Sequence, residues 1–242
     1  EEVRGALICE EDEVLCGFDM VSLEDRTKQH YLYSLDPDYV ESMNKPDWDP
    51  HLTVAIIAGM ITPEQAEKYK SGEDKSIKPI RDLAKNGNYC ATYGGGAKKI
   101  ALTMGVHLSK GKKFHEAYWK LNWAVKEFAN RQEVKDVDGQ LWVFNPVSKL
   151  WYSLRDTKDI FSTINQSTGT YCFDTLLGFI LKERRQLTGQ MHDEGILCSK
   201  IEDTEKVKQI VFNAIESTNN YINLNRRLDV NFGTGKRYSD IH

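Results

Sequence analysis

Four side chains spaced four residues apart constrain the middle of this chain more than any other feature. Arg81, Lys85, Tyr89 and Tyr93 stand at that interval, which on an α-helix places them along one slowly drifting stripe. At about 1.5 Å of rise per residue the stripe is roughly 18 Å long. Pro79 suits a first helical turn because it has no N–H to lose, and three glycines after the last tyrosine suit a left-handed helix end. The spacing therefore predicts a helix with two cations toward one end and two aromatic rings toward the other.

This predicted helix suits a ligand that has a polyphosphate tail and a flat base. The simpler alternative is a surface helix with solvated charges and two packed tyrosines. Taken alone, the helix fits the simpler alternative better, but two further stretches of the sequence change that balance.

Those two stretches carry carboxylates next to apolar runs. Residues 14–18 are apolar and lead to Asp19, while His192, Asp193 and Glu194 precede a second apolar run. Side chains at strand ends are held by a rigid sheet, which suits catalytic carboxylates. If the strand-rich ends of the chain form one antiparallel sheet, Asp19 and Asp193 meet in space.

In chain order, the three stretches resemble the three polymerase motifs of family A DNA polymerases, the DNA polymerase I family. Residues 81–94 match Arg-x3-Lys-x3-Phe/Tyr-x3-Tyr-Gly at every fixed position, and residues 192–194 match His-Asp-Glu. Asp19 to Arg26 matches Asp-x4-Glu-x-Arg, although Val21 stands where the family usually has Ser. Short patterns recur by chance, but three in the right order are specific.

Weaker similarities extend this resemblance over nearly the whole chain. They are Asp49-Pro-His51, the stretch Gln166 to Gly169 and the tail from Leu228. The resemblance implies an α+β fold, with an antiparallel palm sheet and a large inserted helical fingers subdomain. It assigns residues 1–29 to the first part of the palm, 30–157 to the fingers and 158–242 to the second part of the palm.

The implied function is that of a template-directed DNA polymerase, which transfers a nucleotide from a dNTP to a primer 3′-hydroxyl. In the two-metal mechanism, two Mg²⁺ ions (or Mn²⁺ in their place) roughly 3.5–4 Å apart stabilise the attacking and leaving oxygens. Mg²⁺ prefers oxygen ligands and takes few carboxylates from the protein. The resemblance implies Asp19 and Asp193 as the metal ligands, with Glu194 as a further catalytic residue beside them.

The resemblance also assigns contacts with the incoming dNTP. Arg81 and Lys85 would hold the triphosphate, and Lys85 would donate a proton to the leaving pyrophosphate. Tyr89 would lie against the sugar and base, and Tyr93 near the templating base. Glu24 occupies the position of the steric gate, which excludes the 2′-hydroxyl that distinguishes RNA from DNA precursors.

Other residues are implied in contacts with phosphate or with the primer–template. His51 would add a phosphate contact, although a histidine satisfied at a helix start explains this residue nearly as well. Gln166 and His192 would contact DNA near the primer terminus. Ser162 stands where the family usually has Asn, which leaves that DNA contact open.

Two other functions compete with this interpretation. A single-subunit RNA polymerase has related motifs, but Tyr89 and Glu24 both favour DNA synthesis. A non-catalytic DNA-binding subunit would have no reason to retain Asp19, Lys85 and Asp193 together. The family's thumb and exonuclease lie upstream of the matched part, so the resemblance implies an N-terminal segment or subunit as a partner. We therefore expect residues 1–242 alone to bind primer–template weakly.

Composition agrees with a soluble, globular, intracellular protein, for which the cytoplasm of a bacterium or a phage-infected cell is expected. The five cysteines are scattered, which indicates reduced thiols, and no apolar run reaches the length of a membrane span. The net charge is −4, which disfavours a nucleic-acid protein mildly. However, six lysines cluster between Lys98 and Lys120 with Glu116 as the only acidic residue among them, and local fields can attract a polyanion.

Further elements are expected from periodicity and from turn residues. Residues 3–9 and 14–19 predict a hairpin, and the prolines at 37, 46 and 50 predict a loop. The other expected elements are helices over 24–35, 51–58, 97–104, 109–132, 158–184 and 203–219, a hairpin over 137–144, and strands ending at 191, over 195–199 and over 228–232.

Overall fold

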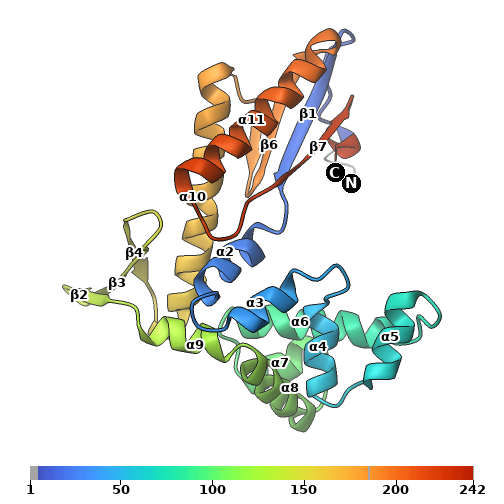
Figure 1. Ribbon diagram of the computed structural model, residues 1–242, viewed down its shortest axis with the longest axis vertical. Coiled ribbons are helices and arrows are strands. Elements are labelled where there is room, and N and C mark those ends of the chain that lie inside the picture. The colour runs from blue at the N-terminus through green and yellow to red at the C-terminus, as the bar shows by residue number, and fades with distance from the viewer. Residues whose placement is uncertain (1–4, 185, 242) are drawn as a thin grey trace. The chain divides into compact units, whose positions relative to one another are not determined.

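The computed structural model describes residues 5–184 and 186–241, and it separates into two compact units (Figure 1). We call Glu1–Tyr31, Asn145–Leu150 and Ile164–His242 the sheet unit. Leu32–Phe144 and Trp151–Thr163 form the helical unit. Helices and one antiparallel sheet in each unit confirm the α+β class. The boundaries at residues 29 and 157, and the names palm and fingers, stay predictions.

The sheet unit is built around a four-stranded antiparallel sheet of order β5-β6-β1-β7. Its strands are β1 (Glu13–Met20), β5 (Gly189–Met191), β6 (Glu194–Lys200) and β7 (Val230–Gly235). Its helices are α11 (Thr204–Ile222) and most of α2 (Leu23–Leu32) and α10 (Ile160–Glu183). The two ends of the chain thus form one antiparallel sheet, as the sequence predicts.

One face of this sheet carries the main core of the unit. Cys16, Phe18 and Met20 of β1 pack with buried side chains of α10 and α11. Because successive side chains of a strand point to opposite faces, Leu15 and Asp19 lie on the other face. There Leu15 packs with Ile196 and Tyr238, the latter from the short 3₁₀ helix η3 (Tyr238–Asp240).

The predicted hairpin between residues 3–9 and 14–19 is wrong for the part that is described. Of residues 5–9, Ile8 makes an isolated bridge with Arg237, and no strand forms. The reason is that a strand has two edges, and β1 pairs with β6 along one and with β7 along the other. Strand β7 also begins two residues later than the predicted Leu228, at Val230.

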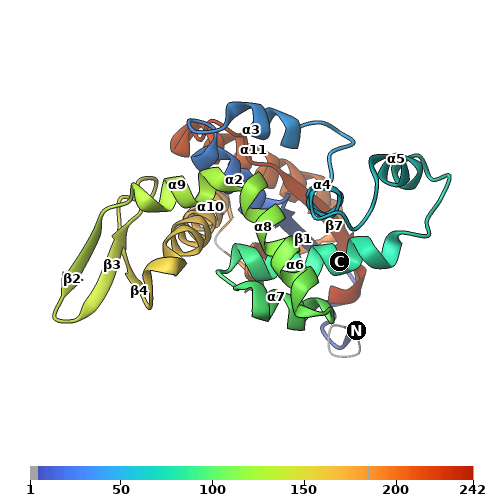
Figure 2. The same ribbon diagram turned by 90° about the horizontal axis from the view of Figure 1, so that it is seen from below.

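The described residues of the helical unit form the complete α-helices α3 to α9, the 3₁₀ helix η1 (Thr157–Asp159) and a small antiparallel sheet of order β2-β3-β4 (Figure 2). The helices pack around a core that includes Leu52, Ala84, Ile100 and Phe114. The bounds are α3 (Pro37–Met43), α4 (Pro50–Ile57), α5 (Pro63–Ser71), α6 (Lys78–Thr92), α7 (Ala97–Met104), α8 (Leu108–Leu121), α9 (Trp123–Asn130), β2 (Val134–Val137), β3 (Gln140–Phe144) and β4 (Trp151–Leu154).

Helix α6 confirms the central prediction. It begins just before Pro79 and ends at Thr92, and Gly94 follows with a φ of 74°. A positive φ of this kind is favourable for glycine. The hairpin between β2 and β3 is also confirmed, and Asp138 and Gly139 both have positive φ in its turn.

Two predictions in this unit are wrong. Pro37 was expected in a loop, but it starts α3 directly after Asp36, whose side chain accepts a hydrogen bond from the backbone N–H of Tyr39. Proline at the first helical position behind a capping side chain begins a helix.

The single helix expected over 109–132 is two helices, separated at Asn122. The buried side chain of Asn122 donates to the carbonyl of Tyr118 and accepts from the hydroxyl of Tyr39. Asparagine is unfavourable inside a helix because its side chain bonds to nearby backbone groups.

None of the helices in the described residues is both long enough and apolar enough to cross a membrane.

Candidate active site

The first component of the site is the end of β1. Asp19 lies opposite Glu194 of β6 and opposite Asn231 of β7 in the sheet register. The amide Nδ2 of Asn231 donates to Oδ2 of Asp19 at 3.4 Å. Because Phe18 and Met20 face the core, the carboxylate of Asp19 projects from the opposite face and is exposed. The sheet therefore fixes the backbone of Asp19 from both sides and leaves its oxygens accessible.

The second component is the tight turn between β5 and β6. Met191 pairs with Glu194, which leaves His192 and Asp193 as the two turn residues. His192 adopts a left-handed φ of 51°. The backbone N–H of Met20 donates to the carbonyl oxygen of Asp193 at 3.1 Å. This hydrogen bond ties the turn that carries Asp193 to the strand end that carries Asp19.

Glu194 differs from the two aspartates in being buried, with 8% of its surface exposed. The phenol of Tyr238 donates to its Oε2 at 2.9 Å, and Tyr238 itself is buried. A hydrogen bond from a buried donor to a charged acceptor is stronger than a neutral one. Tyr238 therefore holds the side chain of Glu194, the residue directly opposite Asp19 in the sheet register.

Gly195 gives the turn its close packing on the core. A Cβ at this position would lie 2.2 Å from Cζ of Phe18, so any larger residue would collide with that ring. Phe18 is directly opposite Gly195 in the register and is 1% exposed. The ring thus supports both strand ends that carry the carboxylates.

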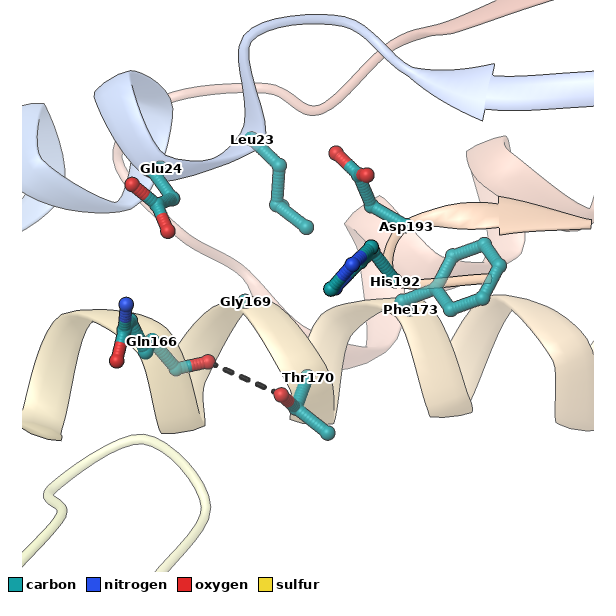
Figure 3. Close-up of a pocket in the computed structure, with 8 residues that line it drawn as sticks. All are labelled: Leu23, Glu24, Gln166, Gly169, Thr170, Phe173, His192 and Asp193. Atoms are coloured by element: carbon teal, nitrogen blue, oxygen red, sulfur yellow. Dashed lines mark hydrogen bonds between the residues drawn. The ribbon is translucent and has the colours of Figure 1, made fainter. Parts of the chain in front are cut away.

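A cavity of about 550 Å³ opens beside Asp193 (Figure 3). In Figure 3, side chains from the start of α2, from α10 and from the β5–β6 turn surround one space. The amide of Asn165 donates to the carbonyl of Glu24 at 3.0 Å and fixes α2 against α10. The lining residues are Leu23, Glu24, Gln166, Gly169, Thr170, Phe173, His192 and Asp193.

The described residues offer a divalent cation few protein ligands. No group of three or more His, Cys, Asp or Glu side chains with metal-binding geometry occurs in residues 5–184 and 186–241. The salt bridges among these residues do not involve Asp19 or Asp193. Mg²⁺ sites often use one or two carboxylates and complete their shell with water and substrate phosphates. Two accessible carboxylates that form no salt bridge among these residues fit that kind of site.

In the helical unit, Arg81 is held by an ion pair at one end of the α6 stripe. Its Nε lies 2.6 Å from Oδ2 of Asp49. Asp49 also caps α4, because its Oδ1 accepts from the backbone N–H groups of His51 and Leu52. Burial alone would raise the pKa of Asp49, but the Leu52 N–H and the Arg81 guanidinium outweigh it and lower the pKa. Arg81 is thus oriented, and it remains 28% exposed.

The rest of the stripe faces outward. Lys85 is exposed, and Tyr89 and Tyr93 are 50% and 42% exposed. The opposite face of α6 packs tightly, since a Cβ at Gly87 would lie 2.6 Å from the Phe114 ring. His51 extends the stripe, because its ring centroid is 6.1 Å from that of Tyr89. Nδ2 of Asn88 lies 2.9 Å from Nδ1 of His51 and orients that ring.

The predicted residues therefore fall into two sets, one in each unit. The sheet unit holds Asp19, Glu24, Gln166, His192, Asp193 and Glu194, and four of these line the same cavity. The helical unit holds His51, Arg81, Lys85, Tyr89, Tyr93 and Ser162. Ser162 is not among the cavity residues, and its hydroxyl donates to the carbonyl of Asp159 in the first turn of α10. The assigned roles of all these residues stay predictions.

Sequence reasoning missed three residues that orient this set. Asn231 reaches Asp19, Tyr238 reaches Glu194, and Asn88 reaches His51. The first two become neighbours of the carboxylates only through strand register and through the return of the C-terminal segment. Asn88 lies in the predicted helix between Lys85 and Tyr89, so the sequence indicated its place on the helix. Its contact with His51, which lies on another helix, could not be predicted.

Comparison with known proteins gives a partial similarity. No protein-family model matches the chain. DNA polymerase I of Helicobacter pylori strain J99 is 31% identical over 133 residues, which is 54% of this chain and 13% of that protein. DNA polymerase I of H. pylori strain 26695 is 29% identical over 130 residues, again 54% of this chain and 13% of that protein. The chain thus resembles DNA polymerase I distantly over about half its length, and the match spans a small part of each relative.

Proposed function

We propose that this chain adds deoxynucleotides to a primer 3′-hydroxyl under the direction of a template, as the palm and fingers portion of a DNA polymerase. The observation that supports this most is the junction of β1 with the β5–β6 turn. It joins two accessible carboxylates, Asp19 and Asp193, through the hydrogen bond between Met20 and Asp193. The distant similarity to DNA polymerase I supports the same conclusion.

In this proposal the sheet unit supplies the reacting centre. Asp19 and Asp193 would hold Mg²⁺, which stabilises the charge that develops on the transferred phosphoryl group. Glu194, held by Tyr238, would add negative charge beside the two aspartates. Glu24 borders the cavity, where its side chain would crowd a ribose 2′-hydroxyl. Gln166 and His192 border the same cavity and would contact the primer–template.

The helical unit would bind the dNTP. Arg81 faces Asp49 and would share its guanidinium with the triphosphate, because Arg can donate to two acceptors at once. Lys85, one helical turn further along, would hold the phosphates and donate a proton to the leaving pyrophosphate. Tyr89 and Tyr93 expose their rings and would contact the sugar, the base and the templating base. His51, beside Tyr89, would add a phosphate contact.

The proposed partners are a primer–template, dNTPs and a thumb-bearing segment or subunit. The curated relatives are much longer than the stretch they share with this chain, and duplex binding depends on many phosphate contacts. We therefore propose that residues 1–242 extend primers poorly at catalytic concentrations.

Single-turnover primer extension tests the function, with protein in excess so that weak DNA binding does not limit the reaction. The proposal expects addition of one complementary dNTP with Mg²⁺, no addition with EDTA, and much slower addition of the matching rNTP. Equal or faster use of the rNTP would indicate an RNA polymerase instead. No addition of either nucleotide, by protein that binds primer–template, would indicate a non-catalytic DNA-binding subunit.

A further inference from the structure

His51, at the start of α4, is held by its own helix and by α6. Its backbone N–H donates to Oδ1 of Asp49 at 2.8 Å, so the cap of α4 fixes its backbone. Two consecutive residues of α6 approach its ring, Asn88 through the side-chain amide and Tyr89 through the aromatic ring. The cap thus fixes where His51 lies, and α6 supplies two of the contacts of its imidazole.

The carbonyl of Pro50 determines the orientation of the Asn88 amide. Nδ2 of Asn88 lies 3.3 Å from that carbonyl oxygen. A carbonyl oxygen accepts hydrogen bonds and cannot donate them, so the reversed amide would set two acceptors against each other. The same Nδ2 lies 2.9 Å from Nδ1 of His51. The amide nitrogen therefore has one hydrogen for each of the two partners.

This orientation decides which nitrogen of His51 carries the proton. A neutral imidazole has one donor nitrogen and one acceptor nitrogen, and the partner of one fixes the role of the other. Because Nδ1 faces a donor, it must offer its lone pair, and the hydrogen of the neutral ring lies on Nε2. His51 thus has its donor at Nε2, and a donor suits phosphate oxygens because these accept hydrogen bonds.

The side-chain oxygen of Asn88 argues against a purely structural role for this residue. Asn88 is 7% exposed, and its Oδ1 has no hydrogen-bond partner among residues 5–184 and 186–241. The other buried residues of α6 are Ala84, Gly87 and Ala91, which are apolar. A buried acceptor without a partner costs free energy, and an apolar side chain at this position would avoid that cost. What the amide contributes is the pair of hydrogen bonds from Nδ2.

We propose that Asn88 is a positioning residue, which fixes the Nε2–H tautomer of His51 and so prepares this ring to donate to the triphosphate of a dNTP. The inference rests on the proposed function, in which His51 contacts phosphate, and it adds a residue that acts only through His51. The opposite tautomer would offer the phosphate oxygens a lone pair, which repels them. Asn88 therefore contributes to the affinity for dNTP without touching it.

Long-range ¹H–¹⁵N correlation spectra of the imidazole rings test the tautomer directly, in labelled protein without nucleotide or metal. His51→Gln identifies the His51 signals among those of the six histidines. At about pH 8, above the ordinary histidine pKa of about 6.5, we expect a protonated Nε2 and an unprotonated Nδ1. Asn88→Asp should place a proton on Nδ1, because a carboxylate only accepts hydrogen bonds. A wild-type ring with its hydrogen on Nδ1 would overturn the proposal.

Single-turnover addition of one dNTP separates positioning from a structural role. Asn88→Leu keeps the approximate size of the side chain and removes the donor. It is expected to raise the apparent Kd for dNTP roughly tenfold, the effect of one hydrogen bond to a charged group, and to leave the maximal rate within about threefold of the wild type. The matched control is Asn86→Leu, the same substitution at an exposed position of α6, which should change neither quantity.

A double-mutant cycle shows whether Asn88 acts through His51. The double variant Asn88→Leu/His51→Gln should have the same apparent Kd for dNTP as His51→Gln alone, because the effects of two residues that act as one unit do not add. Additive effects would refute the proposal. Equal losses in Asn88→Leu and Asn86→Leu would also refute it, since any leucine on α6 would then weaken dNTP binding.

The result is separable from that of the proposed function. Wild-type protein that shows the Nε2–H tautomer but adds no nucleotide would refute the polymerase and retain Asn88 as the residue that sets the tautomer. Nucleotide addition by protein whose His51 carries its hydrogen on Nδ1 would refute the role of Asn88 alone.

Discussion

The sheet unit and the helical unit position their candidate site residues by different means. In the sheet unit, backbone hydrogen bonds do the positioning, because β1 is paired along both edges and Met20 binds the Asp193 carbonyl. In the helical unit, the helical repeat places the stripe, and single side-chain contacts such as Arg81 with Asp49 orient it. The sheet unit thus fixes its carboxylates through the backbone, whereas the α6 side chains depend on single side-chain contacts. Substitutions should therefore cost more in the sheet unit than in the helical unit.

The largest effect on stability is expected from Gly195→Val. Its Cβ would collide with Phe18, so the core or the β5–β6 turn must move. Overpacking at this level costs about 3 kcal/mol of unfolding free energy, and nucleotide addition should fall with it. Urea unfolding measures the loss. Adding Phe18→Leu to Gly195→Val should restore part of the lost unfolding free energy. Gly178→Ala is the control, because the space around Gly178 on α10 is open, and it should not lower the unfolding free energy.

Tyr238→Phe should cause the next largest loss of unfolding free energy. It removes the hydrogen bond to Glu194 and leaves a buried carboxylate with one donor fewer, which costs about 2 kcal/mol. Urea unfolding and the single-turnover rate should both decrease. Tyr221→Phe is the control, because Tyr221 is 66% exposed. If Tyr238→Phe and Tyr221→Phe behave alike, the Tyr238 hydrogen bond does not position Glu194.

Asp49→Asn should have a smaller effect, which sharpens the contrast between the units. Asparagine can still cap α4, so the substitution mainly removes the charge that faces Arg81. The pair is partly exposed, so we expect a loss of about 1 kcal/mol or less. Because the folded pKa of Asp49 is lowered, its contribution is present above the unfolded value of about 3.9 and is lost as pH falls through the folded pKa. Acid unfolding of wild type and variant should converge at low pH; a constant difference down to low pH would contradict the ion pair.

The smallest effect on stability is expected from His30→Gln in α2, and it should depend on pH. Burial lowers the pKa of His30, opposed by the hydrogen bond with Asn225. That hydrogen bond joins Nδ1 of His30 to Oδ1 of Asn225 at 3.0 Å and favours a protonated Nδ1, but burial outweighs it. The unfolded chain therefore binds the proton more readily, and stability falls as pH drops below about 6.5 toward the folded pKa. His30→Gln should remove that slope in melting temperature against pH, and an unchanged slope would assign it to another group.

The comparison of units also explains what could be predicted from the sequence. Local signals sufficed for α6, since Pro79, the four-residue spacing and Gly94 all lie within one segment. The meeting of the chain ends in one sheet was predicted from carboxylates next to apolar runs. The pairing of β1 with β6 and β7 was not predicted. Strand pairing is non-local, and the nearby apolar residues 3–9 suggested a simpler hairpin with β1.

The remaining misses share this physical cause. Asn122 interrupts the α8–α9 segment through its own hydrogen bond to Tyr118 and one from the distant Tyr39, and helical periodicity alone does not reveal such a break. Asn231 and Tyr238 approach the carboxylates by register and by tertiary packing. The side chains proposed to react were chosen from the sequence and their roles stay predictions, whereas most of the side chains that orient them could be found only from the fold.

The central claim is that Asp19 and Asp193 form one catalytic site, and single-turnover addition of one dNTP tests it most directly. The variants are Asp19→Asn and Asp193→Asn, with Asp174→Asn as a control on an exposed position of α10. At saturating Mg²⁺, we predict that each site variant loses more than about 100-fold in rate, because electrostatic stabilisation supplies much of the rate, while folding and the control rate are unchanged. A rate for either site variant within a few-fold of the Asp174→Asn control would contradict the account.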